Sequence, residues 1–237
     1  MKYSQKLGGL AALFEAAAYL LGMVFFIVVL DSTGVVEPAQ QIALLVNNQL
    51  SMQTVILLTY VVFGIMLVLL ALALHDRLRD GAPAIMQTAT VFGLIWACLL
   101  IASGMVYNSG QAAVVALAGS DPLPAVAAWV AIDAVHGGLG GEAEVLGGLW
   151  TLLVSWAALR SGQLPRVLNY LGLVVGFAGI ASIIPGLTMM VAIFALGQIA
   201  WFVWLGILML RTSPGAAAHN SGVETAAPRP ANAAAAR

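Results

Sequence analysis

The run GGLAALFEAAAYLLGMVFFIVVL, residues Gly8–Leu30, is apolar apart from one charged side chain, Glu15. An α-helix rises about 1.5 Å per residue, so about 20 such residues cross the ~30 Å hydrocarbon core of a bilayer. The run is longer than the apolar region of a signal peptide, and no small-x-small cleavage pattern follows it. We therefore expect a retained membrane-spanning helix.

The rest of the chain has the same character. Of its 237 residues, 62% are hydrophobic and 8% are charged, and the mean hydropathy is +1.00. A soluble domain carries about 25% charged residues, so lipid must surround most of this chain. Six segments are long and apolar enough to cross a bilayer: 8–30, 51–74, 84–106, 139–159, 167–184 and 189–210. They predict an all-α integral membrane protein, a six-transmembrane-helix bundle that occupies residues 1–211.

The basic residues predict how this bundle is oriented. In a six-span arrangement all of them fall on one side of the membrane: Lys2, Lys6, Arg77, Arg79, Arg160, Arg166, Arg211, Arg229 and Arg237. Cytoplasmic loops carry the excess of Lys and Arg, so we expect both termini in the cytoplasm. The net charge of −1 and the lack of a basic patch argue against nucleic acid as a partner.

Three segments outside the spans have their own signals. Residues Glu37–Ser51 place Ile42, Leu45 and Val46 among Gln and Asn, which is typical of a short helix on the outer membrane surface or of an extension of the second span. Residues Asp121–His136 begin with Asp-Pro, a helix start signal. Residues 212–237 are rich in Ala, Pro, Ser and Thr and predict a disordered cytoplasmic tail.

Glu15 is the first candidate functional residue. It lies nine residues past Lys6, so it is about 13 Å deep in the membrane. A carboxyl group at that depth must be uncharged or hydrogen-bonded, and Thr151 and Gln198 are predicted at similar depths. Glu15 is therefore either a protonatable residue of a transport pathway or one half of an interhelical hydrogen bond.

The stretch DAVHGGLGGEAEVLGGLW, residues 133–150, supplies the other candidates. On a continuous helix Asp133, His136, Glu144 and Thr151 share one stripe with several glycines. One hypothesis is an outward-facing polar crevice that binds a cation, an amine or a proton. The alternative is a helix-packing face, because glycines allow close approach of a neighbouring helix. These glycines are Gly137, Gly140, Gly141 and Gly147.

Metal and catalytic chemistry have less support from the sequence. Asp133, His136 and Glu144 combine one imidazole with two carboxylates, a ligand set that suits iron or manganese. No Glu-x-x-His pair and no cysteine cluster accompany them, and none of the common catalytic motifs is present in a suitable context. We expect no cofactor.

Three motifs give the chain a family resemblance. They are GGLAALFEAAAYLLG at 8–22, LHDRLRDGAPA at 74–84 and GGLWTLLVSWAALRSGQLPRVLNYLGLVVG at 147–176. With them, residues 7–211 resemble a family of bacterial multi-pass membrane proteins, the domain of unknown function 4386. The resemblance implies a multi-pass protein of the bacterial inner membrane, and it implies no activity or catalytic residue.

Three functions follow as hypotheses. The first is transport or binding of a small molecule, ion or proton. The second is a structural subunit that holds a membrane partner or a second copy of itself. The third is a membrane-embedded metal-dependent enzyme. The lipid bilayer is the one partner that all three share.

Overall fold

The computed structural model describes residues 2–141, 144–187 and 189–211, and the predicted tail at 212–237 lies outside them. Within these ranges the chain is all-helical, as predicted, and contains no strand. The elements are α1 (Lys2–Met23), η1 (Val24–Val29), α2 (Pro38–Asn47), α3 (Gln49–Ile56), η2 (Leu57–Val62), α4 (Phe63–Leu78), α5 (Pro83–Ala118), α6 (Pro122–His136), η3 (Gly137–Gly141), α7 (Val145–Ser161), α8 (Arg166–Ala181) and α9 (Met189–Arg211). The segments η1 and η2 are π-helical turns, whereas η3 contains a kink, because Gly140 has the non-helical angles φ +121° and ψ 18°.

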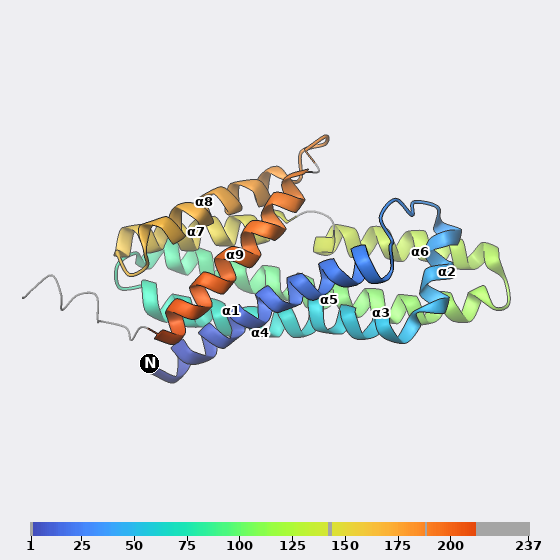
Figure 1. The fold of residues 1–237 in the computed structure, drawn as a ribbon, viewed down its shortest axis with the longest axis horizontal. Coiled ribbons are helices and arrows are strands. Elements are labelled where there is room, and N and C mark those ends of the chain that lie inside the picture. The colour runs from blue at the N-terminus through green and yellow to red at the C-terminus, as the bar shows by residue number, and fades with distance from the viewer. Residues whose placement is uncertain (1, 142–143, 188, 212–237) are drawn as a thin grey trace, which may run out of the picture.

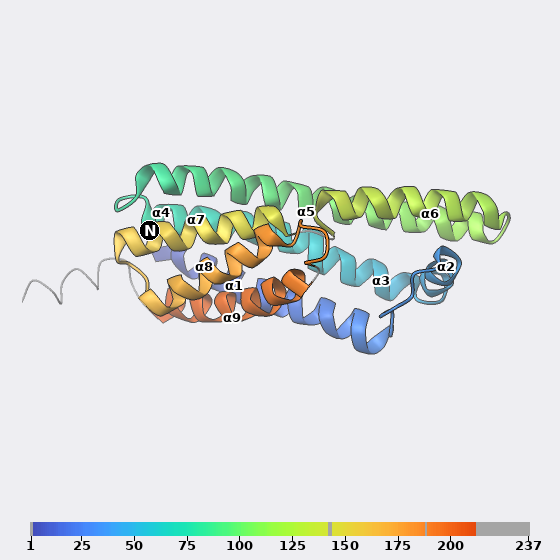
Figure 2. The same cartoon turned by 90° about the horizontal axis from the view of Figure 1, so that it is seen from above.

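Most helices run along one long axis (Figures 1 and 2). The helix α1 packs against α4 and α9, α5 packs against α4, α6 and α7, and α8 packs against α7 and α9. One core lies between α1, α4, α5, α7, α8 and α9, and a second core lies where α2, α3 and α6 meet the far part of α5. The α1 start and the α9 end lie at the same end of the bundle (Figure 1).

Five helical stretches in the described part of the chain are long and apolar enough to span a membrane. They are Ser4–Val29, Gln49–Leu78, Pro83–Ala118, Pro122–Ser161 and Met189–Arg211. The helix α8 is also apolar but has only 16 residues, a length of about 24 Å against a hydrocarbon core of ~30 Å. The structure therefore supports a multi-pass membrane protein, and the number of six crossings stays a prediction.

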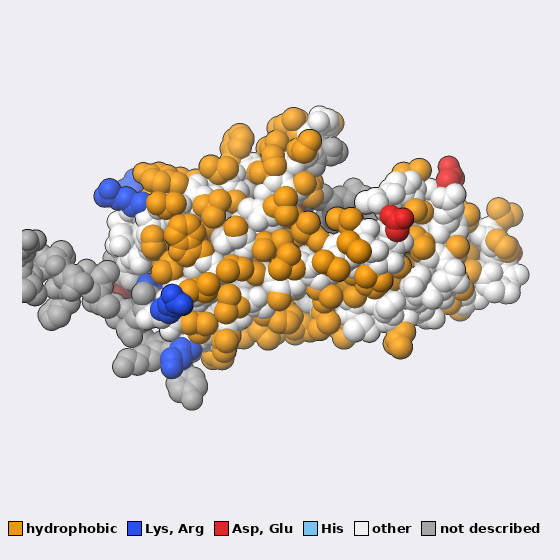
Figure 3. Space-filling view, viewed as in Figure 1, with side chains coloured by type: hydrophobic (Ala, Val, Ile, Leu, Met, Phe, Trp, Pro, Cys, Tyr) orange, Lys and Arg blue, Asp and Glu red, His pale blue; other side chains and the backbone are white. Residues whose placement is uncertain are grey.

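Basic side chains gather at one end of the bundle, which we call the cation end (Figure 3). It contains the α1 start, the α4–α5 and α7–α8 turns and the α9 end, with Lys6, Arg79, Arg160, Arg166 and Arg211. Hydrophobic side chains cover the bundle beyond it (Figure 3). The opposite end, which we call the distal end, carries α2.

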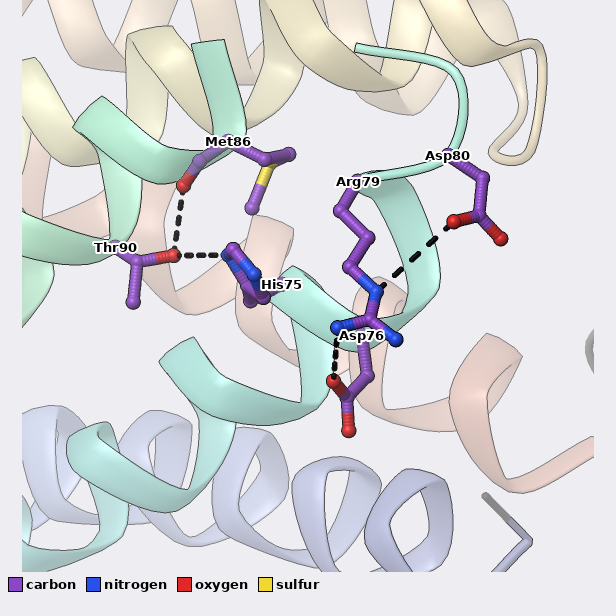
Figure 4. Close-up of polar contacts among 6 residues, drawn as sticks. All are labelled: His75, Asp76, Arg79, Asp80, Met86 and Thr90. Carbon is purple, nitrogen blue, oxygen red and sulfur yellow. Dashed lines mark hydrogen bonds and ion pairs between the residues drawn. The ribbon is translucent and has the colours of Figure 1, made fainter. Parts of the chain in front are cut away.

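The α4–α5 turn is fixed by local polar contacts (Figure 4). The Thr90 hydroxyl donates to the Met86 carbonyl at 2.7 Å, so it accepts from Nδ1 of His75 at 2.9 Å. The Arg79 guanidinium lies 3.8 Å from the Asp76 carboxylate and 3.9 Å from that of Asp80. These ion pairs are exposed and contribute little free energy. The turn is therefore held chiefly by the bond between the two helices.

The distal end confirms the helix predicted from Asp-Pro. The Asp121 carboxylate caps α6 by accepting from the Leu123 amide at 3.3 Å. The helix α2 lies across the long axis (Figures 1 and 2) and buries Ile42 and Leu45. The Trp129 indole of α6 donates to the Gln41 side chain of α2 at 2.6 Å. The polar and apolar faces of α2 thus both find partners within the chain.

The long apolar stretch Pro122–Ser161 is not one continuous helix. Gly140 has φ +121°, a backbone conformation that L side chains rarely adopt, and α7 begins only at Val145. The residue before α7, Glu144, has the non-helical angles φ −96° and ψ 36°. In the structure α7 therefore starts later than the span predicted at 139–159, and the single helical stripe predicted to carry both Asp133 and Glu144 is interrupted.

Candidate functional site

A pocket of about 180 Å³ lies beside this helix break. Its walls come from α1, η1, η2, α4 and α5, and from the residues on either side of the break. The lining residues on which the following argument depends are Tyr19, Phe26, Tyr60, Phe63, Gly140 and Glu144.

Two π-helical turns and the kink at Gly140 border the pocket. Phe26 belongs to η1, Tyr60 to η2 and Gly140 to η3. A π-turn widens the helix by one residue and is found frequently at functional sites. Irregular backbone at membrane depth is tolerated where it is buried in protein or lines a cavity. The convergence of two π-turns and the kink at Gly140 marks this pocket as the candidate functional site.

Glu144 is held in the pocket through its backbone. Its N–H donates to the Ser182 hydroxyl at 3.0 Å, and that hydroxyl donates to the Gly179 carbonyl at 2.7 Å. The Tyr19 hydroxyl donates to Oε1 of Glu144 over a long 3.4 Å. The second carboxylate oxygen of Glu144, Oε2, is buried without a hydrogen-bond partner in the described chain.

Glu15 lies one helical turn before Tyr19 on α1 and has 0% of its surface exposed. Neither of its carboxylate oxygens has a hydrogen-bond partner within the described part of the chain. The predicted partners Thr151 and Gln198 instead contact each other, and the Thr151 hydroxyl donates to the Gln198 carbonyl oxygen at 3.2 Å. The structure therefore brings Thr151 and Gln198 together without a hydrogen bond to Glu15.

Aromatic rings pack against one another around the pocket and in the core next to it. Tyr19 packs edge-on against Phe63 with ring centres 5.4 Å apart. Trp150 packs against Trp96 and against Trp201, each at 5.8 Å between ring centres. The three tryptophans therefore form part of the packed core, where aromatic pairs stabilise the fold, and they do not line the pocket.

The other predicted site residues are separated by the fold. His136 lies between the rings of Tyr60 and Tyr107, at 4.9 and 4.8 Å between centres. The Ser103 hydroxyl bonds to both the His136 carbonyl, at 3.0 Å, and its Nδ1, at 2.7 Å. Asp133 lines a second pocket of about 190 Å³ at the distal end. No three metal-ligating side chains come together among the residues that the structure describes.

The glycines of the predicted packing face have different structural roles within the chain. A methyl group at Gly147 would lie 2.6 Å from the Trp96 ring, so this glycine admits a neighbouring aromatic residue. Gly148, which the sequence analysis did not select, faces the α8 backbone: its added methyl would lie 2.6 Å from the Gly176 carbonyl oxygen. Gly140 provides the break, Gly137 is buried, and Gly141 ends η3. Packing thus uses Gly147 and Gly148 between helices of one chain.

Sequence reasoning did not select Phe26, Tyr60 or Phe63 as site residues. They come from two segments that lie well apart in the sequence, η1 and the junction of η2 with α4, and aromatic residues in membrane segments are common. Tyr19 carried one signal: its position one turn after Glu15 on the same face of α1.

Apolar helices of membrane-spanning length and a hydrophobic surface beyond a basic end define a multi-pass α-helical membrane protein in contact with lipid. The chain belongs to the family described as Domain of unknown function (DUF4386), whose model matches residues 10–208. This confirms the resemblance drawn from the three motifs. No curated protein and no solved structure matches the chain.

Proposed function

We propose that this chain is a bacterial inner-membrane protein that binds a small molecule in the pocket beside Glu144 and carries it across the membrane with proton exchange. The observation that carries the proposal is the pairing of a broken membrane helix with a carboxylate at the break. Glu144 faces the pocket, and its Oε2 has no hydrogen-bond partner in the described chain. Ionisable groups within membrane segments most often mark substrate or proton pathways.

The break also supports a carrier more than a rigid scaffold. Transporters commonly form their binding sites from discontinuous helices, because the interrupted backbone and side chains at the break can reach a ligand. Here the kink is at Gly140, and Glu144, the residue before α7, is tied to α8 through Ser182. A shift of α8 would therefore move the Glu144 backbone and reshape the pocket.

Tyr19 contacts Glu144 and lies one helical turn from a second buried carboxyl group, that of Glu15. In the proposed path a proton passes from Glu144 to Tyr19 and then to Glu15, and the last step requires a movement of the side chains because neither Glu15 oxygen has a hydrogen-bond partner in the described chain. In the proposed topology the cation end faces the cytoplasm, so the pocket lies toward the outer side of the bilayer.

The test is labelling of Glu144 by dicyclohexylcarbodiimide, which reacts with protonated carboxyl groups in apolar surroundings. We expect one rapid adduct on protein in lipid nanodiscs, lost in Glu144→Gln and retained in the control Glu37→Gln, because Glu37 is exposed on the distal side. Mass spectrometry after proteolysis locates the adduct. The rate should fall as pH rises, because the deprotonated carboxylate does not react.

Function requires more than reactivity, so the second measurement is transport. In proteoliposomes we expect a pH gradient to drive uptake of a compound that protects Glu144 from labelling. Glu15→Gln should abolish the pH dependence. An unreactive Glu144 at every pH, or pH-dependent uptake that is unchanged in Glu15→Gln, would contradict the proposed roles.

A further inference from the structure

The pocket beside Glu144 has the chemistry of an ammonium site. We infer that its ligand carries a small organic ammonium group, with the Glu144 carboxylate as counter-charge and the rings of Tyr19, Phe26, Tyr60 and Phe63 as walls. This inference rests on the binding function proposed above and names the ligand class.

The charged residue of the pocket lining favours a positively charged ligand. Glu144 is the acidic residue of the pocket lining, and none of the described lining residues is Lys or Arg. The basic side chains instead gather at the cation end of the bundle (Figure 3). An anionic ligand would bring a second negative charge next to Glu144 in a medium that screens charges weakly. A cation in the pocket would instead offset the charge of the Glu144 carboxylate.

The aromatic residues of the pocket wall favour an organic ammonium group over a metal ion. Four of the lining residues are aromatic, and the face of an aromatic ring attracts an ammonium group within about 6 Å of its centre. A bare metal ion needs several oxygen ligands, and no cluster of three acidic, histidine or cysteine side chains is found in the described chain. The Thr59 hydroxyl at the pocket wall already donates to the Val55 carbonyl at 2.8 Å. Aromatic faces with one carboxylate therefore suit an alkylammonium group and not a metal ion.

The size of the pocket limits the ligand. A volume of about 180 Å³ is below the roughly 300–1,000 Å³ of sites for drug-sized molecules. It holds an ammonium group with a few small substituents. Two sources supply this chemistry in a membrane: a free amine, or the ethanolamine or choline headgroup of a phospholipid whose tails stay in the bilayer. The experiment has one arm for each source.

The experiment compares choline with its uncharged isostere 3,3-dimethyl-1-butanol on the full-length protein in phosphatidylglycerol nanodiscs, which supply no amine headgroup. Protection of Glu144 from carbodiimide reports occupancy of the pocket. We expect choline or ethylammonium to protect at concentrations at least about tenfold lower than the neutral isostere. Because this comparison uses the wild-type protein, it does not depend on the folding of any variant.

Two variants locate the interaction, with binding read from the shift in melting temperature. Tyr60→Leu should weaken choline binding by roughly fivefold, because it removes one aromatic wall. Glu144→Gln should remove the preference for the cation. The control Glu37→Gln should bind choline as wild type does.

The lipid arm uses native mass spectrometry of protein extracted from mixed bilayers. Retention of phosphatidylethanolamine over phosphatidylglycerol, lost on addition of choline and in Glu144→Gln, identifies a headgroup as the source. Binding of free amines without lipid retention identifies a soluble amine. Protection by neutral or anionic compounds as good as that by choline would overturn the ammonium inference and leave the pocket function standing. Protection by no compound, with an unreactive Glu144, would overturn both.

Discussion

Replacement of Glu15 by leucine should make the folded protein more stable. Glu15 has no exposed surface, and both carboxylate oxygens lack a hydrogen-bond partner within the described chain. A buried polar group without partners costs about 1–3 kcal/mol, and an apolar group of similar shape avoids that cost. For a chain of this length, about 2 kcal/mol corresponds to a rise in melting temperature of about 4–8 °C. The assay is thermal unfolding in nanodiscs, followed by tryptophan fluorescence.

Two companion variants separate polarity from size. Glu15→Gln keeps a buried polar group of the same shape, so its melting temperature should stay close to that of wild type. Glu37→Leu, at an exposed position of the distal end, should change stability by less than about 0.5 kcal/mol. A fall of several degrees in Glu15→Leu would refute the reasoning, because it would mean that the carboxyl group makes a stabilising bond in the fold. A stability gain joined to lost pH-dependent uptake is the pattern expected of a residue retained for function.

Two further predictions concern packing and topology. Gly148→Ala should destabilise the bundle by about 1–3 kcal/mol, because the added methyl would lie 2.6 Å from the α8 backbone. The control Gly138→Ala, whose methyl meets nothing within 4 Å, should be near neutral. Equal melting temperatures of the two variants would reject the close α7–α8 contact. Single cysteines at Asp80 and Gln163 should react with an impermeant maleimide only from the cytoplasmic side of oriented vesicles, and a cysteine at Glu37 only from the other; labelling of Asp80 and Gln163 from opposite sides would reject the proposed topology.

The fold class could be predicted because it depends on the combined hydrophobicity of many residues in each segment. A helix of about 20 apolar residues has few alternatives in lipid, and one misjudged residue does not change the result. The position of Asp121 before Pro122 located the α6 start for a local reason: its side chain caps the adjacent backbone.

The site could be predicted only in part, because it depends on backbone angles at a few positions. The stripe from Asp133 to Thr151 assumed 100° per residue, and this phase is lost at η3, where Gly140 turns to φ +121°. Asp133 and Glu144 consequently line different pockets. Glu144 still lines a pocket, because it lies at the break itself.

The shortness of α8 has a consequence for the surrounding lipid. As the fifth crossing of the proposed topology, its 16 residues fall about 6 Å short of the hydrocarbon thickness, a case of hydrophobic mismatch that the bilayer relieves by thinning locally. The thinned region adjoins Ser182, which holds the Glu144 backbone. Acyl-chain length should therefore affect the proposed transport, with short-chain bilayers favouring the arrangement in which headgroups and water come nearest to the carboxylate.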